Sequence, residues 1–170
     1  MAGNHLEELV AEWYQHEGYF VRRNIQVGKR PKGGYECELD IVAFHPERKE
    51  LVHIEPSLDA DGWEKREQRY SKKFDAGRRF IPTMFHGLEL PSKIDQVALF
   101  VYGGGGHKTL AGGRCMFIKD FMRAILNTIR ERHVDNAAIP EEYPLLRTLQ
   151  FAAQYWPVSA AASVEVQTLP

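Results

Sequence analysis

The chain has 170 residues, of which 44% are hydrophobic and 26% charged, and its formal net charge is -1. This length corresponds to about one domain, and the composition excludes a wholly disordered, collagenous or fibrous chain. The apolar runs are far shorter than the roughly 18 residues of a membrane span, and the N-terminus lacks the pattern of a secretory signal, so we expect a cytoplasmic protein with no membrane partner.

The first half of the sequence predicts a helix, a strand and a hairpin. Asn4 can cap a helix through LEELVAEWYQHEG, whose apolar residues recur on one face, and Gly18 ends it. Residues 19–27 are rich in aromatic and β-branched side chains, which predicts a strand, and the breaker-rich GKRPKGG follows. ELDIVAF (38–44) and ELVHIEPS (50–57) flank the turn-like HPERK, which predicts an antiparallel hairpin.

The second half predicts three helices and one buried strand. A helix over residues 63–79 contains no proline, and the continuous apolar run at 96–102 is typical of a fully buried strand. The glycine-rich run at 103–113 fits no phosphate-loop pattern, so we expect a flexible loop. Residues 116–132 predict an amphipathic helix, and another follows Pro144. We expect a single domain over 1–156 and a C-terminal tail over 157–170.

The near-zero net charge hides a strong segregation along the chain. Residues 22–32 carry five basic side chains and no acid, residues 34–64 carry nine acids against two bases, and residues 65–79 carry seven bases against two acids. Basic surfaces around an acidic centre suit a protein that holds a polyanion and places metal ions at one point on it. Ordinary solvated faces are the alternative.

The two strands of the hairpin each present a carboxylate on the same expected face. Alternation of side chains directs Leu39, Ile41 and Ala43 to one side and Asp40 to the other, and it places Glu55 on the face opposite Ile54. Paired strands would bring Asp40 and Glu55 together, where their charges repel. A hard cation resolves that conflict, because Mg²⁺ binds one or two carboxylates together with waters and phosphate. Two exposed carboxylates on a solvated face remain the alternative.

Other chemical signals are weak or missing. The two cysteines, Cys37 and Cys115, form no CxxC pair, and the seven histidines form no HxxxH pair, so neither a disulfide framework nor a transition-metal site is predicted. There is no GxSxG motif of an α/β-hydrolase. His53 shares the expected face of Glu55, where it can act as a general base or be a simple hydrogen-bonded residue.

The order of these elements resembles the PD-(D/E)XK, or restriction-endonuclease-like, nuclease superfamily. The resemblance covers about residues 6–79: a Glu-bearing helix ending in Gly-Tyr, then ELDIVAF, LVHIEPS and a basic helix, with QVALFVY as the next core strand. It implies an α/β fold with a central mixed β-sheet flanked by helices, and a Mg²⁺-dependent (or Mn²⁺-dependent) site that hydrolyses phosphodiester bonds in DNA, RNA not being excluded. Homodimers are a habit of the family, so a homodimer is a possible assembly.

The resemblance also assigns roles to residues at matching positions. Asp40 and Glu55 would be the metal-binding acids, the carbonyl of Pro56 a further metal ligand, and Glu7 an assisting carboxylate from the first helix. One position departs from the pattern, because Ser57 stands where the motif has lysine and its neutral hydroxyl cannot stabilise developing negative charge. The following helix offers Lys65, Lys72 and Lys73 as substitutes.

The proposed reaction is metal-assisted hydrolysis, with a helix lysine orienting the attacking water. Basic side chains outside the site would hold the phosphate backbone without reading sequence, namely Arg22, Arg23, Lys29, Arg30, Lys32, Arg69, Arg78 and Arg79. Two competing interpretations stay open. Ser57 favours a nuclease fold that binds nucleic acid without cutting it, and the apolar tail is compatible with a structural subunit of a larger complex.

Overall fold

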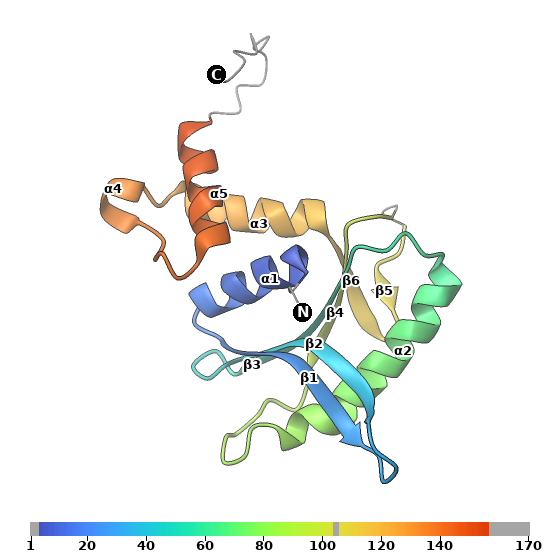
Figure 1. Cartoon of the computed structure of the whole chain (residues 1–170). Helices are drawn as coiled ribbons and strands as arrows, with labels where there is room; N and C mark the ends of the chain where they lie inside the picture. The colour runs from blue at the N-terminus through green and yellow to red at the C-terminus, as the bar shows by residue number, and fades with distance from the viewer. Residues whose placement is uncertain (1–3, 104–105, 157–170) are drawn as a thin grey trace. The chain divides into compact units, whose positions relative to one another are not determined.

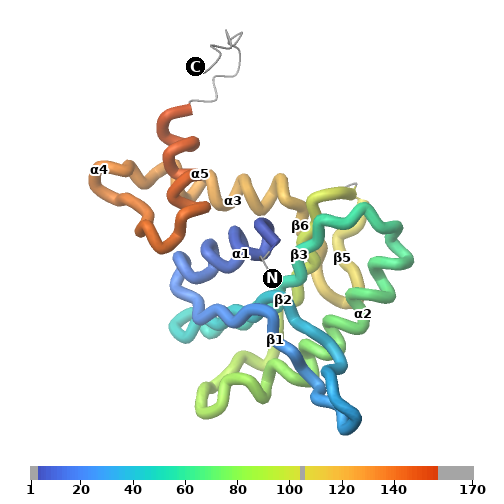
Figure 2. Tube along the Cα trace, viewed as in Figure 1, coloured from blue at the N-terminus to red at the C-terminus, as the bar shows by residue number. Residues whose placement is uncertain are grey.

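The first three strands form an antiparallel meander. They are β1 (Phe20–Lys29), β2 (Tyr35–His45) and β3 (Glu50–Ser57) in the computed structural model, which describes residues 4–103 and 106–156. Ile41 lies opposite Ile54 in the register of β2 and β3, so the predicted hairpin is confirmed. The turn between β1 and β2 projects beyond the other strands of the sheet (Figure 2).

Three further strands complete a mixed sheet. β4 (Asp95–Phe100) runs parallel to β3, β6 (Gly113–Phe117) runs parallel to β4, and the short β5 (Thr109–Leu110) is antiparallel to β6. The strand order is β1-β2-β3-β4-β6-β5. The parallel step from β3 to β4 requires a crossover, which contains α2 (Trp63–Phe80) and the 3₁₀ turn η1 (Ile81–Thr83). The six-stranded mixed sheet is flanked by helices (Figure 1), so the expected α/β class is confirmed.

The first helix, α1 (His5–His16), forms as its sequence predicts. The side-chain oxygen of Asn4 accepts a hydrogen bond from the backbone N–H of Leu6 at 3.0 Å, which caps the helix. Leu6 and Val10 are buried, and α1 packs against the strands β1, β2 and β3. Gly18 follows the helix with φ +89°, a left-handed conformation that favours glycine.

The helix α2 is polar over most of its surface and buries only a narrow stripe. Tyr70 and Phe74 pack edge to face with ring centroids 5.5 Å apart, and Tyr70 also contacts Phe100 of β4. Gly113 of β6 allows this close packing, because a Cβ atom there would lie 2.4 Å from the ring of Phe74. The stripe fixes which α2 side chains face the sheet.

Two expectations for residues 103–132 are wrong in part. Met116 and Phe117 belong to β6, so the predicted helix over 116–132 is instead α3 (Ile118–Arg130). Backbone pairing of β6 with β4 overrides the amphipathic pattern at these positions. The apolar stripe itself is present, because Phe121, Ile125 and Ile129 are buried. The glycine-rich segment expected to be a loop contributes the strand β5 and the first residue of β6.

Contacts divide the chain into two compact units, Met1–Ile125 and Leu126–Pro170, with α3 extending across the division. The second unit contains α4 (Val134–Ala137) and α5 (Pro144–Tyr155), the latter confirming the helix expected after Pro144. A single domain over 1–156 therefore stays a prediction, and the tail over 157–170 lies outside the described residues. Within the described part of the chain, no helix is both long and apolar enough to cross a membrane.

Candidate active site

Asp40 of β2 and Glu55 of β3 lie beside each other, as alternation along the hairpin predicts. The backbone N–H of Asp40 donates to Glu55 Oε1 at 3.1 Å. The Glu55 side chain is 1% exposed and that of Asp40 is 15% exposed. Two acids at this depth are costly unless a positive charge compensates them.

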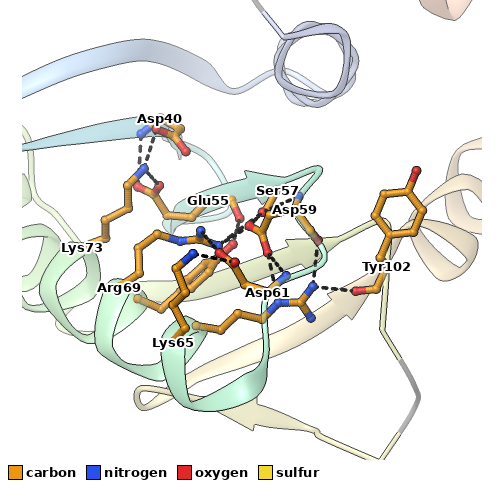
Figure 3. A network of polar contacts seen from close by, with 11 residues as sticks. Asp40, Glu55, Ser57, Asp59, Asp61, Lys65, Arg69, Lys73 and Tyr102 are labelled. Atoms are coloured by element: carbon orange, nitrogen blue, oxygen red, sulfur yellow. Dashed lines mark hydrogen bonds and ion pairs between the residues drawn. The ribbon is translucent and has the colours of Figure 1, made fainter.

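Lys73 supplies that positive charge from α2. Its Nζ lies 2.6 Å from Asp40 Oδ1 and also donates to Glu55 Oε2, so one ammonium group joins both carboxylates (Figure 3). Lys73 is one of the three lysines considered as substitutes at the position of Ser57. The other two lie elsewhere, because Lys65 pairs with Asp61 at 2.7 Å and Lys72 is exposed on α2.

Burial and the charges at this site shift the pKa values of Asp40 and Lys73. Burial, together with hydrogen bonding and charge from Glu55, raises the pKa of Asp40 from 3.8 to about 7, although Lys73 opposes the shift. Burial alone would lower the pKa of Lys73, but the charges of Glu55 and Asp40 outweigh it and raise that pKa above its ordinary value. The lysine is therefore a permanent cation, while Asp40 titrates close to neutral pH.

We expect the raised pKa of Asp40 to be visible in the pH dependence of the metal-free protein. Because the pKa of Asp40 is higher in the folded chain than in the unfolded chain, the folded state binds its proton more tightly. This contribution to the free energy of unfolding is present at acidic pH and is lost as the pH rises through about 7. Side-chain carboxyl NMR in the presence of EDTA should show Asp40 titrating near pH 7. Titration near pH 4, the ordinary range of a free aspartate, would contradict this description.

The carboxylates open onto a cavity of about 240 Å³. Its wall is formed by the residue before α1, by β2, by the end of β3 with the loop that follows, and by the facing side of α2. The lining residues are Asn4, Asp40, Glu55, Pro56, Ser57, Leu58, Asp59, Arg69, Tyr70 and Lys73. The hydroxyl of Tyr70 donates to the backbone carbonyl of Glu55 at 3.1 Å, which fixes the strand end. The site therefore combines fixed acids, one cation and an open side.

Ser57 takes part in the loop rather than in the pairing of the acids. Its hydroxyl donates to Asp59 Oδ2, and it accepts a bond from the backbone N–H of Asp59 at 3.2 Å. Arg69 pairs with both Asp59 and Asp61 (Figure 3). Hydrogen bonds, including those from Ser57 and Arg69, outweigh burial and lower the pKa of Asp59 to about 2. The predicted phosphate contact Arg69 is thus already compensated by two carboxylates.

A buried arginine, which the sequence analysis did not single out, holds the same loop. Arg66 is 2% exposed and donates to the backbone carbonyls of Asp59 and Tyr102 at 2.8 and 3.0 Å. Its guanidinium lies 4.3 Å from the ring centroid of Phe100. A basic helix gives no sign of which arginine is internal, so only the packing of α2 identifies it.

The other predicted phosphate-binding residues are spread over the first unit. Arg23 pairs with Glu8 through two hydrogen bonds of 2.7 and 2.5 Å, Arg78 pairs with Asp75, and Arg79 pairs with Glu36. Of the predicted contacts, four are exposed on β1 and the turn after it without a described ion pair, namely Arg22, Lys29, Arg30 and Lys32. Lys72, on α2, is also exposed without one. Lys72 and Lys73 also line a second cavity, of about 590 Å³, together with Tyr35 of β2.

Glu7 lies near the acids on α1 and is partly buried. Burial and the charge of Asp40 raise its pKa, while Lys73 and Arg23 act in the opposite direction. The charges of Asp40 and Lys73 therefore act on Glu7. The adjacent Glu8, rather than Glu7, forms the ion pair with Arg23.

His53 occupies a buried position beneath Glu55. Its side chain is fully buried, and Nε2 lies 2.7 Å from Glu55 Oε1. Burial and the charge of Lys73 lower its pKa to about 3. The ring is therefore neutral at physiological pH, and it has no path to a solvent-exposed substrate. The structure supports the hydrogen-bonded role over that of a general base.

The donor set at this cavity consists of carboxylate and backbone carbonyl oxygens. In residues 4–103 and 106–156, no group of three or more His, Cys, Asp or Glu side chains is arranged to hold one. Mg²⁺ needs only one or two protein carboxylates, because waters and substrate phosphates complete its shell. Asp40 and Glu55 provide that number, Pro56 lies in the same wall, and the contacts of Lys73 show that the pair accommodates positive charge. These residues fit Mg²⁺ or Mn²⁺.

Comparison of the sequence with protein-family models finds no match, and comparison with curated proteins likewise finds none.

Proposed function

We propose that the protein is a divalent-metal-dependent nuclease that hydrolyses phosphodiester bonds in DNA. The observation that carries the proposal is the position of Lys73, which reaches from α2 to both Asp40 and Glu55. The motif of the superfamily has a lysine close to its acids, and Ser57 stands at that position in this chain. Lys73 provides a lysine beside the two carboxylates, at an open cavity. The proposal includes a restriction-endonuclease-like core built on β1, β2, β3, α2 and β4, in line with the resemblance of the sequence to that superfamily.

Each residue then has a separate task. Asp40 and Glu55, with the carbonyl of Pro56, would hold Mg²⁺ or Mn²⁺, which supplies Lewis-acid activation of the scissile phosphate and of a water molecule. Lys73 stays charged and would stabilise negative charge that develops on the attacking water and the phosphate. Glu7 would assist from α1 by accepting a hydrogen bond from that water.

The phosphate backbone would run over basic residues for which residues 4–103 and 106–156 provide no described acidic partner. Lys72 lies beside the second cavity, and Lys29, Arg30 and Lys32 lie at the projecting turn of the β1–β2 hairpin. Contacts of this kind give affinity that falls with salt and carry no sequence readout. Arg23, Arg69, Arg78 and Arg79 have acidic partners, so we expect them to contribute less.

A non-catalytic nucleic-acid-binding module is the second candidate, because Ser57 stands in place of the motif lysine. The contacts of Lys73 favour catalysis, since a surface that only binds phosphate gains nothing from one buried and one partly buried carboxylate. A structural subunit of a larger complex is the third interpretation, and it predicts neither binding nor cutting of DNA.

The proposal is tested by incubating the full chain with supercoiled, linear and four-way-junction DNA in Mg²⁺, in Mn²⁺ and in EDTA. We expect cutting of at least one substrate with either metal and none with EDTA. Binding without cutting on every substrate would favour the non-catalytic module. Cutting that persists in EDTA would contradict the proposed chemistry.

A further inference from the structure

A buried polar chain of Gln96 and His53 connects Arg78, at the surface of α2, to Glu55. Gln96 of β4 is 5% exposed, and its Nε2 lies 2.8 Å from the backbone oxygen of Phe74 and 3.1 Å from His53 Nδ1. Its Oε1 accepts a hydrogen bond from Arg78. His53 continues the chain to Glu55 Oε1.

The two outer partners fix the orientation of the Gln96 amide. Arg78 can only donate, so it must meet the amide oxygen, and the carbonyl of Phe74 can only accept, so it must meet the amide nitrogen. The NH₂ group therefore donates to His53 Nδ1, which has to be unprotonated. A neutral imidazole then carries its proton on Nε2, and that N–H donates to Glu55 Oε1.

The two carboxylate oxygens of Glu55 therefore have different partners. Oε1 accepts from His53 Nε2 at 2.7 Å and from the backbone N–H of Asp40 at 3.1 Å. Oε2 is left for the cation, a position that contacts Lys73 in this structure. With the other tautomer, a lone pair of His53 would face Oε1 and repel it.

We infer that Gln96 is a positioning residue: by fixing the tautomer of His53, it holds Glu55 with Oε2 presented to the cavity. The inference rests on the proposed function, because Glu55 is taken there as a metal ligand. Buried partners of this kind orient metal-binding carboxylates and contribute to metal affinity.

The packing of α2 against His53 holds the imidazole ring in place. A Cβ atom on Gly77 would lie 2.4 Å from His53 Nδ1 and 3.1 Å from the Gln96 amide nitrogen. Only glycine lets the helix approach the ring so closely. The ring of Phe74 lies edge to face with His53, with centroids 5.5 Å apart, and limits its rotation.

The tautomer is measured directly by ¹⁵N NMR of histidine-labelled full chain in EDTA, with His53→Phe identifying the resonances. We expect the wild type to carry its His53 proton on Nε2. In Gln96→Glu the new carboxylate can only accept, so we expect His53 Nδ1 to become protonated. A wild-type proton on Nδ1 would overturn the inference.

The effect on the metal site is measured as Mn²⁺ affinity by calorimetry. Gln96→Glu should bind Mn²⁺ about 10- to 100-fold more weakly than the wild type. Gln150→Glu is the matched control, because Gln150 is also fully buried and, among the described residues, its side chain bonds backbone groups and Arg147 in the second unit. It should leave the affinity unchanged although it too buries a carboxylate.

Two results separate the inference from the proposed function. Unchanged Mn²⁺ affinity in Gln96→Glu, or in the volume-matched Gln96→Met if the first variant does not fold, would overturn the positioning role while leaving the nuclease proposal intact. Absence of Mn²⁺ binding by the wild type would overturn the proposed function, and the His53 spectrum would still decide whether Gln96 sets the tautomer.

Discussion

Replacing Lys73 with methionine is expected to slow metal-dependent DNA cleavage about 100- to 1,000-fold, the usual effect of removing one group that stabilises transition-state charge. The substitution keeps most of the aliphatic length and removes only the ammonium that contacts Asp40 and Glu55. Metal affinity should not fall, because the two carboxylates lose a competing cation. Single-turnover cleavage at saturating Mn²⁺ separates the rate from metal binding.

Lys72→Met is the matched control for this prediction, since Lys72 is the exposed neighbour on the same helix. It should weaken DNA binding and leave the single-turnover rate on bound DNA nearly unchanged. Lys65→Met, which removes the ion pair with Asp61, should behave in the same way. A larger rate loss in either control than in Lys73→Met would assign the catalytic lysine elsewhere on α2.

Asp40→Asn is expected to weaken Mn²⁺ binding by at least about 100-fold and to abolish detectable cleavage. Loss of a group that supports a metal ligand costs about 10- to 100-fold in affinity, and loss of the ligand itself should cost more. The amide keeps the volume but cannot provide a charged oxygen. Calorimetry of the full chain measures the affinity. The substitution should also remove the neutral-pH titration of the metal-free protein, because that titration belongs to Asp40.

Asp61→Asn controls for the removal of a nearby acid. Asp61 pairs with Lys65 and Arg69 and does not line the cavity of about 240 Å³. We expect normal Mn²⁺ affinity in this variant. Equal losses in both variants would indicate general electrostatic attraction rather than a site at Asp40.

The juxtaposition of Asp40 and Glu55 could be predicted because it depends on local rules. Alternation within each strand and a short connecting turn determine which side chains share a face, and the observed register agrees. The capped helix α1 and the buried strand β4 were predictable for the same reason. Each is set by periodicity within one segment.

The choice of Lys73 among the helix lysines could not be predicted locally. Lys65, Arg69, Lys72 and Lys73 share one side of an ideal helix, so spacing alone does not separate them. The rotation of α2 about its axis decides which lysine faces the two carboxylates. Close contacts at Gly77 and Gly113 set that rotation. These contacts join residues distant in sequence, and the same holds for β6, whose pairing with β4 overrides a helical pattern.

Gln96 was overlooked because it opens a run that otherwise consists of apolar residues. A polar side chain at the start of a buried strand is a usable signal, since buried amides require hydrogen-bond partners. The sequence does not reveal those partners, because His53, Phe74 and Arg78 come from β3 and α2.

The most direct test of the central claim is nicking of supercoiled plasmid by the wild type in Mn²⁺, measured beside Glu55→Gln purified in the same way. Glu55 is nearly fully buried between His53 and Lys73, so the isosteric amide removes the metal-binding charge with little change in shape. We expect nicking that needs Mn²⁺ and is lost in Glu55→Gln. Equal nicking by both proteins, or no nicking by the wild type in Mn²⁺, would contradict the proposed function.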